Sequence, residues 1–64
     1  MKSEFVIGDH VAYNKNSKYE YVVDEVETLS NGGKNYHLIA ATDETGRKYG
    51  IDHWQNGRKL VFVR

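Results

Sequence analysis

Residues 36–54 have the sequence YHLIAATDETGRKYGIDHW, in which two stretches rich in aromatic and branched side chains flank a polar turn. The flanking stretches, 36–42 and 47–54, suit β-strands because branched and aromatic side chains fit a pleated, half-buried surface. Between them, Asp43 can accept a backbone N–H two residues further along, and Gly46 can adopt a positive φ, which together favour a type I turn. This stretch therefore predicts a β-hairpin closed by a three-residue loop with a bulge.

The predicted hairpin has a register that assigns one of its faces to a core. Pairing Asp43 with Arg47 gives the core face three cross-strand pairs: Ala41 with Tyr49, Ile39 with Ile51, and His37 with His53. The outward face then has four pairs: Thr42 with Lys48, Ala40 with Gly50, Leu38 with Asp52, and Tyr36 with Trp54. We place the second set outward because Lys48 and Asp52 would be costly to bury without partners. The alternative register is shifted by one residue and groups Tyr49 and Ile51 with Leu38 and Tyr36.

The rest of the chain has the same character. Ten of its 25 apolar residues are Val or Ile, eight are aromatic and three are Leu, which favours strands and predicts no helix longer than a turn or two. Because proline is absent, glycine and asparagine mark the turns, and they delimit five segments at residues 5–13, 19–29, 36–42, 47–54 and 58–63. Closing five short antiparallel strands into a barrel removes exposed strand edges. We therefore predict an all-β fold, a small five-stranded antiparallel barrel that forms a single domain over residues 1–64.

The second segment contains a break in its alternation. Tyr21 and Val23 fall on one face of a regular strand and Val26 falls on the other. A bulge near Asp24 and Glu25 would bend the strand and return Val26 to the face of Tyr21 and Val23. The alternative is a strand without a bulge, with Val22 and Val26 buried and the tyrosines outside.

Length, charge and composition exclude several classes of protein. The 64 residues contain no cysteine, so neither a disulfide framework nor a thiolate zinc site can supplement the core. Nine basic and nine acidic residues give a net charge of zero, without the uniform basic field of a dedicated duplex-binding protein. The longest apolar runs have four residues, far fewer than a membrane span or a signal peptide needs. We expect a cytoplasmic protein that does not bind membranes.

The segment Ile7-Gly8-Asp9-His10-Val11 is similar to the Gly-Asp-x-Val start of many SH3-like barrels, including KOW and Tudor-type modules. The turn at residues 43–46, followed by Tyr49 and Ile51, resembles the central hairpin of these domains. The resemblance covers nearly the whole chain and implies an SH3-like barrel that binds a protein segment or nucleic acid. The sequence departs from Tudor modules in lacking an evident aromatic cage, and from ribosome-associated KOW modules in lacking a basic surplus.

Catalytic and metal sites find little support in the sequence. His37 and His53 face each other in the predicted register, but no cysteine is present and Asp52 falls on the opposite face, so we expect neither a metal nor another cofactor. We expect instead a partly buried histidine pair whose mutual repulsion lowers stability below about pH 6. No Ser or Thr has the spacing of a nucleophile with its base, and Gly32-Gly33 precede strand residues rather than a phosphate-binding helix. We therefore expect no enzymatic activity and no catalytic residues.

Surface recognition remains as the expected function. Residues 1–32 carry three basic and six acidic side chains, and residues 33–64 carry six basic and three acidic ones. We predict a binding surface in the basic half, made of outward aromatic rings and of cations near turns: Tyr36, Trp54, Arg47, Lys48, Arg58 and Lys59. For Trp54, the alternative is a plug that folds back over the open end of the barrel. The neutral total charge favours a protein partner, with weak, sequence-nonspecific nucleic-acid binding as the alternative, and the chain is expected to be a monomer or a weak homodimer.

Overall fold

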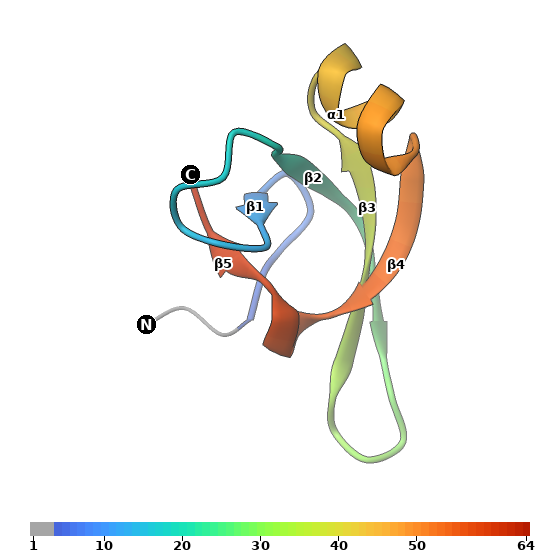
Figure 1. The fold of residues 1–64 in the computed structure, drawn as a ribbon. Coiled ribbons are helices and arrows are strands. Elements are labelled where there is room, and N and C mark those ends of the chain that lie inside the picture. Colours follow the sequence, from blue (N-terminus) through green and yellow to red (C-terminus); the bar gives the residue numbers. More distant parts are fainter. Residues whose placement is uncertain (1–3) are drawn as a thin grey trace.

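The computed structural model describes residues 4–64 as one five-stranded antiparallel sheet with a short helix (Figure 1). The strand order is β4-β3-β2-β1-β5. The elements follow one another as β1 (His10–Ala12), β2 (Tyr21–Thr28), β3 (Lys34–Ala40), α1 (Asp43–Tyr49), β4 (Asp52–Asn56), the 3₁₀ turn η1 (Gly57–Lys59) and β5 (Val61–Phe62). The all-β prediction is confirmed, and α1, with seven residues, is about two turns long and so stays within the predicted limit on helix length. Within residues 4–64, β4 does not pair with β5, so the described sheet is not a closed barrel.

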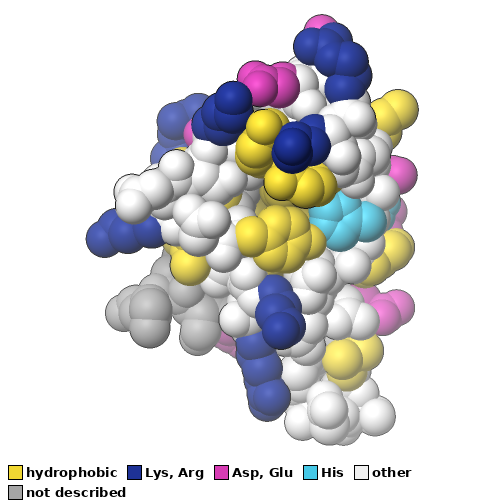
Figure 2. Space-filling view, viewed as in Figure 1, with side chains coloured by type: hydrophobic (Ala, Val, Ile, Leu, Met, Phe, Trp, Pro, Cys, Tyr) yellow, Lys and Arg dark blue, Asp and Glu magenta, His cyan; other side chains and the backbone are white. Residues whose placement is uncertain are grey.

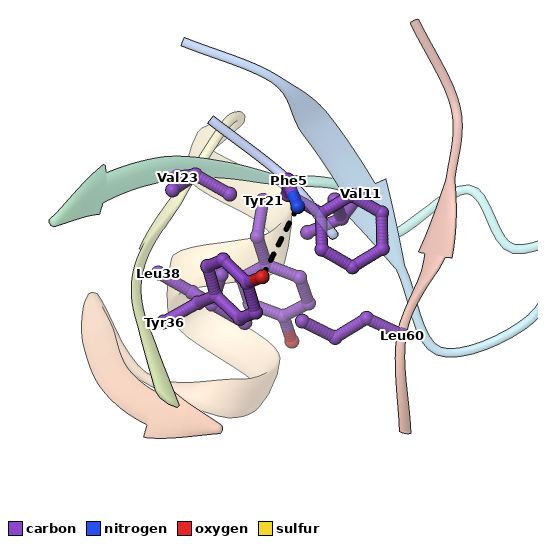
Figure 3. Close-up of a cluster of buried hydrophobic side chains, with 7 residues drawn as sticks. All are labelled: Phe5, Val11, Tyr21, Val23, Tyr36, Leu38 and Leu60. Carbon is purple, nitrogen blue, oxygen red and sulfur yellow. Dashed lines mark hydrogen bonds between the residues drawn. The ribbon is translucent and has the colours of Figure 1, made fainter. Parts of the chain in front are cut away.

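The core lies against one face of this curved sheet. Seven apolar side chains from the N-terminal segment, β1, β2, β3 and the turn before β5 form it (Figure 3): Phe5, Val11, Tyr21, Val23, Tyr36, Leu38 and Leu60. The rings of Phe5 and Tyr36 meet edge to face, with their centroids 5.3 Å apart. Burial of apolar side chains is the main favourable contribution to folding in a domain without disulfides.

The predicted bulge in the second strand is confirmed. The register between β2 and β3 shifts between Val23 and Glu25, while Tyr21 and Val23 are buried. The alternative without a bulge is therefore wrong. Val26 pairs with Tyr36, and so lies on the core face as expected, but it is partly exposed because the β2–β3 hairpin extends beyond the rest of the sheet there (Figure 1).

The predicted hairpin turn at residues 43–46 is wrong, because these residues begin α1. The Thr42 side chain caps the helix by accepting a hydrogen bond from the Thr45 backbone N–H at 3.1 Å. Acidic residues occupy the first turn and basic residues the last, which complements the helix dipole. Gly50 ends the helix with a φ of 96°, a conformation that glycine adopts readily.

The helix α1 takes the place of the predicted start of the fourth strand. The register between β3 and β4 also differs from the predicted one, which paired His37 with His53. Leu38 pairs with His53, and His37 pairs with Trp54, which is the alternative shift by one residue. Tyr36 and Leu38 therefore face the core, and His37 and His53 lie on opposite faces of the sheet. Tyr49 and Ile51 do not join the core, since Ile51 is 74% exposed.

The first and last strands are shorter than predicted. Phe5 is buried, but residues 6–9 form a turn in which the Asp9 backbone N–H donates to the Val6 carbonyl at 3.0 Å. Gly8 adopts a φ of 98° in this turn. Near the C-terminus, Arg58 and Lys59 form part of η1, although the prediction places them in the fifth strand. No helix within residues 4–64 has the length and the apolar composition that crossing a membrane would require.

Candidate binding face

The six residues of the predicted binding surface do not come together. Tyr36 is only 1% exposed, so its predicted outward position is wrong. Trp54 is 47% exposed on the outer face of β4, which also excludes the alternative of a folded-back plug. Arg47 and Lys48 lie in the last turn of α1, whereas Arg58 and Lys59 lie in η1. Figure 1 places these two elements at opposite ends of β4.

Aromatic side chains do cluster at another surface, and none of them is among the six predicted residues. The rings of Tyr19 and Tyr49 meet edge to face at 5.0 Å, and Tyr13 stacks on His53 at 6.0 Å. The buried ring of Tyr21 packs edge to face on both Tyr13, at 5.7 Å, and His53, at 5.1 Å. The loop between β1 and β2, the helix and β4 thus each supply rings to one surface.

Two lysines complete this surface. The Lys18 ammonium lies 5.3 Å from the centroid of the Tyr19 ring, and the Lys48 ammonium lies 5.8 Å from the centroids of both Tyr19 and Tyr49. Cations at such distances from ring faces are attracted by the π electrons. We call this surface the aromatic–lysine face and define it by its accessible members: Tyr13, Lys18, Tyr19, Lys48, Tyr49 and His53. Of the predicted site, only Lys48 belongs to it.

The two lysines differ in their availability to a ligand. Lys18 forms an ion pair with Glu44 at 3.0 Å, and this contact raises the pKa of the lysine. Lys48 has no ion pair with any carboxylate in residues 4–64. Its charge is therefore available to a negatively charged group that approaches the tyrosines.

Burial favours the uncharged form of two phenol groups at the aromatic–lysine face, those of Tyr13 and Tyr21. Tyr13 Oη lies 2.6 Å from Nε2 of His53 and donates a hydrogen bond to Oε1 of Gln55 at 3.2 Å. Burial raises the pKa of Tyr13 above its usual range, because it disfavours the charged phenolate. Burial, together with the neighbouring Tyr13 and Tyr49, has the same effect on the pKa of Tyr21. The face thus offers hydroxyl groups and ring surfaces rather than phenolate charge.

Figure 2 shows a surface of this composition on one side of the molecule. Hydrophobic side chains lie in its middle with a histidine beside them, and Lys and Arg side chains lie both above and below. A ligand that crosses such a surface meets apolar rings at the centre and positive charge towards the ends.

Trp54 lies on the opposite face of the sheet, in acidic surroundings. Its ring is 5.1 Å from that of His37, whose Nδ1 lies 3.2 Å from Asp24 and whose Nε2 lies 3.1 Å from Asp52. The predicted combination of Trp54 with basic residues is therefore not formed. The two ring nitrogens of His37 point in opposite directions, so these carboxylates cannot converge with the histidine on one ion. Residues 4–64 contain no cluster of three or more groups suited to hold a metal.

A hollow of about 350 Å³ lies between the β2–β3 turn and η1. Lys34 and Arg58 line it, but Glu4 also lines it and forms an ion pair with Lys34 at 3.4 Å. The Gly33 N–H in this hollow already donates to the Asn31 side chain at 2.9 Å, as expected of a hairpin turn. The hollow is therefore less suited to an anion than its two cations suggest.

Comparisons of the chain with models of protein families, with curated proteins and with solved structures found no match.

Proposed function

We propose that the protein is a non-enzymatic binding module that holds an acidic protein segment on its aromatic–lysine face. The observation that carries this proposal is the position of the Lys48 ammonium, 5.8 Å from the rings of both Tyr19 and Tyr49 and free of a carboxylate partner in the described chain. A Glu or Asp side chain can pair with Lys48 while a neighbouring apolar side chain covers the rings.

The accessibility of the rings supports this role. Tyr49 is 54% exposed and Tyr13 is 42% exposed, although both are large and partly apolar. Tyrosine is well suited to interfaces because it combines an apolar ring with a hydroxyl that finds a hydrogen-bond partner. The zero net charge of the chain favours a local contact of this kind over long-range attraction to a polyanion.

The proposed location of the protein is the cytoplasm.

The proposed scaffold is an SH3-like barrel, and two features of the sheet support it. The last strand, β5, returns to pair with the first, β1, and the bulge lets β2 bend while it pairs with both β1 and β3. The proposed barrel is partly open, with β5 paired to β1 and the outer edge of β4 unpaired. Contacts between β1 and β5 across a strongly curved sheet in an NMR structure are the expected sign of this fold, and a flat sheet would contradict this part of the proposal.

The test is an amide-resolved NMR titration with a short peptide in which Glu alternates with Leu. We expect shifts at Tyr13, Lys18, Tyr19, Lys48 and Tyr49, and weaker binding as salt rises. Lys48→Ala should weaken binding by about fivefold to tenfold, while Lys59→Ala, a matched change in η1, should have little effect. Shifts confined to other surfaces, or equal effects of the two variants, would refute the proposal.

Single-stranded nucleic acid is the second candidate, and the alternation of cations with accessible rings favours it. Bases stack on aromatic side chains while lysines contact the phosphates. Titration with oligo-dT distinguishes the two functions. Affinity for the oligonucleotide that exceeds affinity for the peptide, and that falls steeply between about 50 and 200 mM salt, would replace the first proposal with the second.

A further inference from the structure

Strand β4 forms one edge of the sheet, with β3 on one side and no strand on the other among residues 4–64. In Figure 1 it runs along the outside of the molecule, from α1 to η1. An uncovered edge strand presents a row of backbone N–H and C=O groups that can pair with another strand. The other edge, β5, has only two residues and offers a much shorter row.

The hydrogen-bonding pattern shows which residues of β4 face outward. The Ala40 backbone N–H donates to the Ile51 carbonyl at 2.8 Å, which makes this position a hydrogen-bonded pair of the β3–β4 ladder. Such pairs recur every two residues in an antiparallel ladder. The backbone groups of His53 and Gln55 therefore face β3, and those of Asp52, Trp54 and Asn56 face away from it.

We propose that this edge pairs with the same edge of a second copy of the chain, antiparallel and centred on Trp54. In this register Trp54 is opposite Trp54 of the second copy, Asp52 is opposite Asn56, and His53 is opposite Gln55. All three outward residues then fall at hydrogen-bonded positions of the new ladder, so the backbone pattern is satisfied without a shift. The interface is isologous, as in most protein homodimers.

The side chains of β4 favour a second copy over an unrelated strand. Asp52 is the only charged residue of β4, and this register places it opposite a neutral amide. A register centred on Asp52 would bring two carboxylates face to face, which is destabilising. A register centred on Asn56 would carry part of η1, with its two cations, into the pairing. The strand also lacks the lysine and proline residues that commonly protect sheet edges.

The pairing would also bring two binding faces together. His53 and Gln55 lie on the same side of β4 as the aromatic–lysine face, and the two-fold axis of an antiparallel hydrogen-bonded pair is perpendicular to the sheet. Both faces of the dimer would therefore point the same way and bind a repetitive partner bivalently. The dimer itself is independent of the proposed function and holds whatever the partner is.

Sedimentation equilibrium of the full chain from micromolar to millimolar concentration tests this proposal. We expect a monomer–dimer equilibrium, and in mixed labelled and unlabelled samples we expect intermolecular NOEs between the Trp54 backbone protons of the two copies. Trp54→Lys places like charges at the centre of the pairing and should raise the dimer dissociation constant by about tenfold or more. Ile7→Lys is the matched control, because Ile7 is an exposed apolar residue in the turn before β1.

Amide NMR spectra of Trp54→Lys and Ile7→Lys serve to check that both variants are folded. A chain that stays monomeric at millimolar concentration would overturn the proposal. A dimer that Trp54→Lys leaves intact, or that Ile7→Lys weakens equally, would overturn it as well. If an unrelated extended peptide pairs with β4 while the chain alone stays monomeric, the edge binds foreign strands and the homodimer is refuted.

Discussion

The Tyr36 hydroxyl accepts a hydrogen bond from the backbone N–H of Phe5 at 3.1 Å, across 31 positions of the chain. Figure 3 shows this bond inside the core, between the N-terminal segment and strand β3, which lies between β4 and β2. Both residues are buried, and their rings are also in contact. The bond therefore fixes a segment that belongs to no strand onto β3, an interior strand of the sheet.

Tyr36→Phe removes this acceptor and keeps the ring. The Phe5 N–H is then buried without a partner, which costs about 1–3 kcal/mol of unfolding free energy. We expect a lower urea midpoint and faster hydrogen exchange at the Phe5 amide. Tyr49→Phe, which changes an exposed tyrosine, serves as the control and should leave both quantities nearly unchanged. Equal effects of the two variants would mean that the bond contributes nothing to stability.

Leu38→Ala should strongly destabilise the protein. Leu38 is completely buried, and replacing such a side chain by alanine costs about 2–5 kcal/mol. A domain of this size has a total stability of only about 3–10 kcal/mol. Urea unfolding followed by circular dichroism measures the loss of stability. Ile39→Ala, one position away on the other face of β3, should lower the free energy of unfolding markedly less. A larger loss for Ile39→Ala than for Leu38→Ala would contradict the assignment of Leu38 to the core face.

Thr42→Ala should destabilise α1 and with it the aromatic–lysine face. The variant loses the side-chain acceptor for the Thr45 N–H and the 2.9 Å contact between the Thr42 and Thr45 hydroxyls. Loss of such a cap costs about 1 kcal/mol. We expect amide shifts through residues 43–49 and weaker edge-to-face contact of Tyr49 with Tyr19. Thr42→Ser should restore both, since serine caps equally well; failure of this rescue would contradict the assignment.

His37 should make the protein more stable as pH falls from about 8 to about 6. Desolvation is the largest single effect on this histidine and lowers its pKa, but hydrogen bonds to Asp24 and Asp52, with their charges, together outweigh it, so the pKa is raised above the usual range. A raised pKa means that the stabilisation is fully present below the unfolded value of about 6.5 and is lost as pH rises through the folded value.

We therefore expect the stability difference between the natural chain and His37→Gln to be larger at about pH 6 than at about pH 8 in urea unfolding. Asp24→Asn should lower the His37 pKa measured by NMR. A difference that grows with pH would refute this assignment. The expected loss of stability from repulsion between His37 and His53 has no structural basis, because the β3–β4 register places the two rings on opposite faces.

The bulge in β2 could be predicted because Tyr21, Val23 and Val26 cannot share one face of a regular strand, and an extra residue brings them together. The helix was missed although Thr42, the charge order of residues 43–48 and Gly50 all signal it. Asp43 and Gly46 also suit a turn, and a helix of seven residues is marginal on its own. Its buried Thr45 shows that packing against the sheet stabilises it.

The aromatic–lysine face was beyond sequence reasoning, because its residues come from a loop, a helix and an edge strand. Lys48 and Tyr49 approach Tyr19 only after α1 forms, and Tyr13 stacks on His53 only when β4 has its actual register. A one-residue change of register moves every side chain of a strand to the other face. This single shift explains why Tyr36 is buried and why Trp54 lies among carboxylates.

The amino-acid sequence by itself determined the β class, the five-strand count and the site of the bulge, since these follow from side-chain shape and from alternation between neighbours. Tertiary structure decided which face of β3 packs in the core, whether residues 43–49 form a helix, and which aromatic rings contact the lysines. Those outcomes depend on the packing of Leu38, Tyr36 and Thr45 against distant segments, and no local pattern encodes that free energy.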